Sequence, residues 1–73
     1  MEFKDVQINE YYRVWGKYEL MYRGWYNKGL EEIENFLKGV TKRIVKVVDK
    51  KENGAIYIEG YKSFICADWL TEM

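Results

Sequence analysis

The residue types best suited to molecular recognition lie together in one stretch, residues 11–28, YYRVWGKYELMYRGWYNK. This stretch contains seven aromatic side chains and four basic ones, against a single acid, Glu19. We expect about half of the rings to be buried, with Tyr12 and Met21 in the core. The remaining rings cannot all point inward if the segment is a strand followed by a loop. An outward-facing aromatic and basic surface is therefore predicted.

Alternation along a strand selects the members of that surface. Tyr12 and Val14 would face the core, so their neighbours would face the opposite side of the sheet. A clustered apolar patch in water invites association with a partner. Trp15 and Trp25 have an alternative, which is to pack on a helix. The predicted binding residues are Tyr11, Arg13, Trp15, Tyr22, Arg23, Trp25 and Tyr26.

Two kinds of partner suit such a surface. Tyr, Trp and Arg are the residue types enriched in protein-binding hot spots. The same rings could stack on nucleobases while Arg13, Lys17, Arg23 and Lys28 contact phosphates. Twelve basic residues balance twelve acidic ones over the whole chain, whereas nucleic-acid grooves carry an excess of positive charge. We favour a host protein as the partner, with nucleic acid as the alternative.

The chain lacks the usual equipment of an enzyme. It has no histidine and only one cysteine, Cys66, whose neighbours Ile65 and Ala67 suggest a buried small side chain. No glycine-rich phosphate loop occurs. Three glutamates cluster at positions 31, 32 and 34, which suits the first turns of a solvated helix better than a metal site. A non-catalytic protein without cofactor or metal is therefore expected.

The clearest structural signal is a β-hairpin in residues 42–61. Two β-branched runs, residues 44–48 and 55–59, suit half-buried strands. Between them, Asn53-Gly54 supplies residue types that accept the positive φ of a tight turn. The hairpin provides a scaffold and carries no chemistry of its own.

The loop length of this hairpin determines which side chains face the core. A three-residue loop, 52–54, sets Val48 opposite Ile58 and places Gly54 at the left-handed position of a bulged turn. A two-residue loop sets Asp49 opposite Ile58 instead. The longer loop is preferred because it gives Gly54 that left-handed position.

A short helix, about residues 29–38, precedes the hairpin. Leu30, Ile33, Leu37 and Val40 form one helical stripe, and Gly39 is placed to end the helix. Strands are expected at 11–15, continuing past Gly16 to Met21, and at 63–67, with a short edge strand or extended lead-in within 1–9. A turn at Asp68 follows. The predicted core is Val48, Ile56, Ile58, Leu30, Ile33, Leu37 and Trp69.

Three segments give the chain a family resemblance. VQINEYYRV resembles the opening strand of SH3-like small barrels, RIVKVVDKKENGAIYIEGY their central hairpin, and ADWL their closing turn. Residues 16–41 would be a helix-bearing insertion. The resemblance implies an α+β fold, a mostly antiparallel open barrel with one short helix inserted before the central hairpin. Because such barrels bind proteins, peptides, DNA and RNA, the fold leaves the function open.

A second resemblance concerns the helical segment. A strand, then KGLEEIENFLKG, then a strand is similar to the layout of small phage inhibitors of uracil-DNA glycosylase. It implies an inhibitor or adaptor, encoded by a phage or mobile element, that occludes a host protein surface.

Length and hydropathy set the remaining expectations. Residues 1–73 make a single domain. No apolar run approaches the length of a membrane span and no signal peptide opens the chain, so a cytoplasmic protein without membrane contact is expected. A homodimer is a further expectation, formed through an exposed edge strand near residues 3–8.

Overall fold

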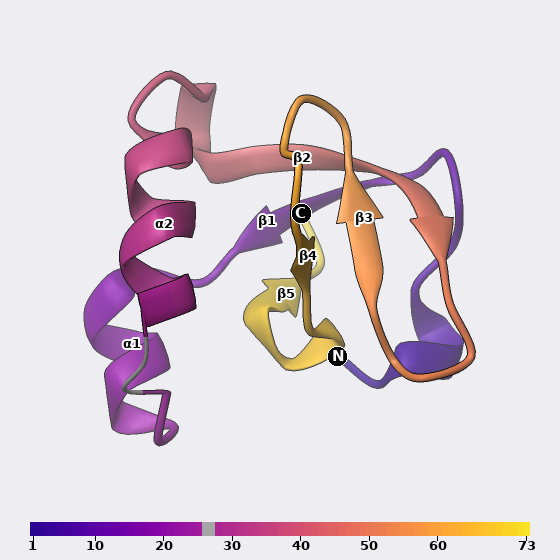
Figure 1. Cartoon of the computed structure of the whole chain (residues 1–73), viewed down its shortest axis with the longest axis horizontal. Helices are drawn as coiled ribbons and strands as arrows, with labels where there is room; N and C mark the ends of the chain where they lie inside the picture. Colours follow the sequence, from indigo (N-terminus) through magenta and orange to yellow (C-terminus); the bar gives the residue numbers. More distant parts are fainter. Residues whose placement is uncertain (26–27) are drawn as a thin grey trace.

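The computed structural model describes residues 1–25 and 28–73, with Lys28 described by its backbone alone. Within these residues the fold is α+β, with five strands, two α-helices and three short 3-10 turns (Figure 1). The strands are β1 (Tyr11–Val14), β2 (Ile44–Lys50), β3 (Ile56–Ile58), β4 (Phe64–Ile65) and β5 (Leu70–Thr71). The helices are α1 (Lys17–Tyr22) and α2 (Lys28–Leu37), and the 3-10 turns are η1 (Phe3–Asp5), η2 (Thr41–Arg43) and η3 (Ala67–Trp69).

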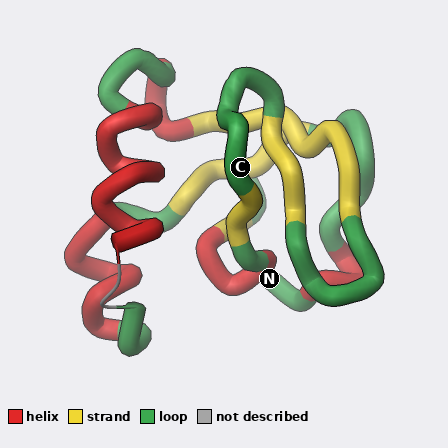
Figure 2. Tube along the Cα trace, in the orientation of Figure 1, coloured by secondary structure: helices red, strands yellow, loops and turns green. Residues whose placement is uncertain are grey.

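The strands form one open antiparallel sheet in the order β4-β3-β2-β1-β5. The longest strand, β2, pairs with β1 on one side and with β3 on the other, and so joins the two halves of the sheet (Figure 2). The last strand returns to the first, with Leu70 opposite Val14. The two edges of the described sheet are therefore β4 and β5.

The hairpin loop has the predicted length. Lys51 and Ala55 are hydrogen-bonded across its base, and Gly54 closes it with a φ of 96°. Residues 52–54 are thus the loop, and glycine is required at its left-handed position because a side chain would be strained there.

The predicted register beyond that loop is wrong by one residue. A bulge lies between Val47 and Asp49, so that Val47, not Val48, stands opposite Ile58. Val47 is fully buried, whereas Val48 is 42% exposed and does not belong to the core. An extra residue in one strand turns the following side chains to the other face of the sheet, and the loop sequence carries no sign of it.

The helical stripe is confirmed at three of its four positions as the inner face of α2, whereas Val40 lies beyond the end of α2 and is only partly buried. Leu30, Ile33 and Leu37 are buried against the sheet, and the other predicted core residues Ile56, Ile58 and Trp69 are buried with them. Tyr12 and Val14, predicted to face the core, are also buried there. The sequence prediction omitted further buried members of this core, which are Val6, Leu20, Val45, Val47, Ile65, Ala67 and Leu70.

Residues beyond Gly16 do not continue the first strand. Lys17–Tyr22 form α1, the Leu20 amide donates to the Gly16 carbonyl at 3.0 Å, and the Leu20 side chain is fully buried. The described part of the insertion before the central hairpin therefore holds two α-helices, where one was predicted. Leu20 alone is buried in α1, and a single buried residue produces no helical stripe to read.

The N-terminal segment also differs from the prediction. Phe3–Asp5 form a 3-10 turn, and no strand occurs within residues 1–9. Val6 is buried in the core, whereas Ile8 is exposed. The edge strand on which the predicted homodimer contact depended is therefore absent, because η1 folds the segment onto the core.

The side chain of Arg43 links α2 to the end of β1 by hydrogen bonds. Its guanidinium donates to both carboxylate oxygens of Glu34 in α2, at 3.0 and 2.6 Å. It also donates to the backbone carbonyls of Val14 and Trp15. Two parallel bonds to a carboxylate fix the direction of both side chains. Arg43 thereby sets the position of α2 relative to the sheet.

Candidate functional site: a cleft between α2 and β4

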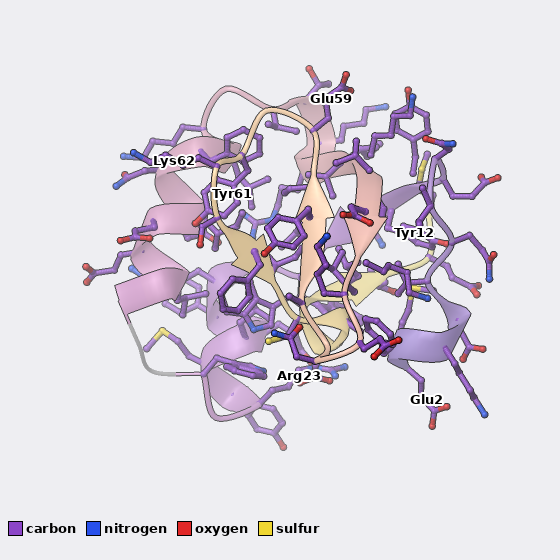
Figure 3. The ribbon with its side chains drawn as sticks, turned by 45° about the vertical axis from the view of Figure 1, so that its right-hand side comes forward. Glu2, Tyr12, Arg23, Glu59, Tyr61 and Lys62 are labelled. Carbon is purple, nitrogen blue, oxygen red and sulfur yellow. The ribbon has the colours of Figure 1, made fainter. Side chains whose placement is uncertain are left out.

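A hollow lies between α2 and the β4 edge of the sheet. A cavity of about 240 Å³ adjoins a shallower one of about 290 Å³, and Glu32, Tyr61 and Ser63 line both. We name the two together the α2–β4 cleft. Figure 3 shows Tyr61 and Lys62 in the loop between β3 and β4, beside α2. The cleft is lined by Trp25, Gly29, Glu32, Asn35, Tyr61, Lys62, Ser63, Phe64, Ile65, Cys66 and Trp69.

Aromatic rings in contact with one another line this cleft. Trp25 packs edge-on against Trp69 with ring centroids 5.6 Å apart, and its indole N–H donates to Asp68 at 2.9 Å. Tyr61 packs on Phe36 of α2 with centroids 5.1 Å apart. Rings held by such contacts form a pre-organised apolar wall that loses little freedom when a ligand binds.

Two lining residues of the cleft, Tyr61 and Cys66, have pKa values raised above their ordinary values. Burial, reinforced by the charge of Glu32, raises the pKa of the Tyr61 hydroxyl above its ordinary value. Burial, reinforced by Asp68, likewise raises the pKa of the Cys66 thiol. The half-buried Cys66 was predicted to be a small core residue, and it lines the cleft instead. A protonated thiol is a poor nucleophile at neutral pH.

Three predicted binding residues lie together beside the cleft, linked by direct contacts or through Asp68; they are Trp15, Arg23 and Trp25. Arg23 stacks on Trp15 at 4.8 Å from the ring centroid. It also forms ion pairs with Glu19 at 3.2 Å and with Asp68 at 3.3 Å. Asp68 in turn accepts the Trp25 N–H. This cluster ties α1 to η3, and Trp25 is the predicted binding residue that lines the cleft.

The other predicted residues are distributed over different parts of the surface. Tyr11, 53% exposed, and Arg13 lie on the outer face of β1, as alternation predicted. Tyr22 is 87% exposed on α1, four residues after the equally exposed Tyr18. Tyr26 lies outside the described residues. That these side chains bind a partner stays a prediction.

Metal-binding and membrane-spanning features are absent from the described residues. No group of three or more His, Cys, Asp or Glu side chains is placed to hold a metal ion there. Neither described helix combines the length and the apolarity needed to cross a bilayer.

Sequence reasoning missed most of the cleft. Glu32 was assigned only to a solvated turn, and Tyr61, Ser63 and Phe64 were given no functional role. Nothing in their local sequence distinguishes them, because the cleft exists only where α2 and β4 come together. Comparisons with protein-family models, with curated proteins and with solved structures found no significant match to this chain.

Proposed function

We propose that this chain is a non-catalytic protein-binding module that holds part of its partner in the α2–β4 cleft. The observation that carries the proposal is the cleft itself, an apolar hollow that combines an ordered Trp25–Trp69 pair with a strand edge. Protein partners are anchored most strongly by side chains that enter such water-excluding pockets. The module acts by occupying a surface of a host protein, as an inhibitor or adaptor encoded by a phage or mobile element.

We also propose that the sheet is an SH3-like open barrel. Two features support this assignment: β5 returns to pair with β1, and η3 lies directly before β5. The segment ADWL, from which the resemblance was drawn, spans that turn. The two helices described between β1 and β2 are a departure from the plain barrel, and α2 supplies one wall of the cleft.

The experiment fills the cleft without removing core atoms. Ser63→Trp adds a large side chain to a half-buried position in the lining. Glu52→Trp adds the same side chain to the exposed hairpin loop and is the matched control. Each immobilised protein is exposed to host lysate, and the retained proteins are quantified by mass spectrometry. Circular dichroism verifies that both variants are folded.

We expect one lysate protein to be retained both by the original chain and by Glu52→Trp. Folded Ser63→Trp should not retain that protein. Equal retention by all three proteins would place the binding surface elsewhere. Turnover of a substrate by the purified chain would contradict the non-catalytic assignment.

Nucleic-acid binding is a second candidate, which one observation favours. Tyr11 stands opposite Lys46 on the outer face of the β1–β2 pair, and Arg13 follows two residues later on that face. A ring flanked by cations suits a single strand. Its test is the anisotropy of a labelled oligonucleotide at increasing salt, since neutralised phosphates make affinity fall steeply. Binding that is absent, or insensitive to salt, removes this candidate.

A further inference from the structure

The edge of β4 that is not paired with β3 lies on the side of the cleft. On its inner side β4 pairs with β3, through Ile65 opposite Ile56 and Phe64 opposite Tyr57. In Figure 1, β4 lies between β3 and α2, and both residues of β4 line the cleft together with Glu32. An unpaired strand edge presents backbone donors and acceptors that a further strand can satisfy.

The cleft offers room and chemistry for one large side chain. A cavity of about 240 Å³ bounded by Trp25, Trp69 and Ile65 accepts an aromatic or long aliphatic group. Burying that group removes apolar surface from water, which is the main favourable contribution to such binding.

Glu32, on the wall of the cleft, is an acid without an ion pair among the side chains that the structure describes. It is exposed on α2, lines both hollows and forms no ion pair with any other residue whose side chain is described. By contrast, the neighbouring Asp68 is already paired with Arg23. A cation brought by the ligand would therefore find an acceptor at Glu32, which gives charge complementarity to a basic partner segment.

We propose that the α2–β4 cleft binds an extended, basic segment of a partner protein as an additional strand on the outer edge of β4. One large apolar side chain of that segment enters the cleft against Trp25 and Trp69. A Lys or Arg two positions away, on the same face of the segment, reaches Glu32. This inference rests on the proposed function and specifies the class of segment that the module recognises.

The test uses a synthetic peptide as the probe. A capped peptide of about ten Thr and Val residues, with a central Trp and a Lys two positions later, provides an extended segment with the required anchor and charge. It is titrated into the ¹⁵N-labelled full chain, and backbone amide signals are followed by NMR. Three matched peptides serve as controls. In one, Glu replaces the Lys. The other two carry N-methyl groups on alternate backbone amides, one peptide on the odd-numbered amides and the other on the even-numbered amides.

The expected result has three parts. Signals of residues 61–66 and of α2 shift on titration. The Lys-to-Glu peptide binds about fivefold more weakly, as the loss of one half-exposed ion pair implies, and Glu32→Gln abolishes that difference. One of the two N-methylated peptides fails to bind, because its donors to β4 are blocked.

The inference is overturned if no signal of residues 61–66 shifts at about 1 mM peptide, the upper limit of useful weak affinity. It is also overturned if both N-methylated peptides bind normally, or if Glu32→Gln leaves the preference for Lys unchanged. Any of these results leaves the Ser63→Trp retention experiment unaffected. Failure of the strand-addition mode is therefore distinguishable from failure of the proposed function.

Discussion

Arg43→Ala should loosen the attachment of α2 to the sheet. The substitution removes two hydrogen bonds to Glu34 and two to the carbonyls of Val14 and Trp15. Breaking a fully buried ion pair costs about 3–5 kcal/mol, and an exposed pair is worth at most about 1 kcal/mol. The side chains of Arg43 and Glu34 are 28% and 22% exposed, so the pair lies between these limits. We expect a loss of about 2–3 kcal/mol, since the orphaned carboxylate regains part of its hydration.

For a domain of this size, such a loss lowers the melting temperature by about 10–20 °C. The assay is thermal unfolding followed by circular dichroism, with urea unfolding as an independent measure of the free energy. Lys42→Ala is the matched control, because Lys42 is the exposed neighbour and has a similarly positive φ, 55° against 59°. The control should melt within about 2 °C of the original chain, as surface substitutions usually do.

A double-mutant cycle isolates the contribution of the ion pair. Glu34→Gln keeps the shape of the carboxylate and removes its charge, so it should lose less stability than Arg43→Ala. The two losses should not add in the double variant, because both remove the same interaction. If Arg43→Ala melts with the Lys42→Ala control, or if the losses are additive, Arg43 does not fasten α2 and the reasoning is refuted.

Three further outcomes are expected. Ile58→Ala should lower the free energy of unfolding in urea by about 2–5 kcal/mol, because Ile58 is buried. Val48→Ala should lower it by under about 0.5 kcal/mol, because the bulge exposes Val48. Comparable losses for the two variants would contradict the observed register. Gly54→Ala should lower the free energy of unfolding by about 1 kcal/mol, because alanine is strained at the positive φ of this position. Gly39→Ala should leave the free energy of unfolding unchanged, because its added Cβ meets nothing closer than 4.0 Å. If thermal melts show the reverse order, the described conformation of the hairpin loop is wrong. Because burial raises the pKa of the Cys66 thiol, iodoacetamide should react more slowly with the folded chain than with the urea-unfolded chain near pH 8. The stability linked to this thiol is complete below its ordinary pKa of about 8.5 and decreases as pH rises toward the folded value, so a stability that increases over that range would refute the assignment.

The sequence alone was sufficient where structure depends on a few neighbouring residues. The loop of the hairpin follows from Asn53-Gly54, and Gly54 has the positive φ that its position demanded. The inner face of α2 follows from the spacing of Leu30, Ile33 and Leu37. Alternation correctly divided β1 into a buried face and an exposed face. These features are local, and side-chain periodicity reports them directly.

Tertiary packing decided the features that connect distant segments. The bulge that exposes Val48 belongs to the pairing of β2 with β3, so the β2 sequence read alone does not reveal it. Arg43 reaches Glu34, nine residues away, and Val14, 29 residues away. The cleft joins Glu32 of α2 to the β4 edge and to Trp69. A site assembled from separate elements leaves no periodic signal in any of them, because its geometry exists only after the helix has packed against the sheet.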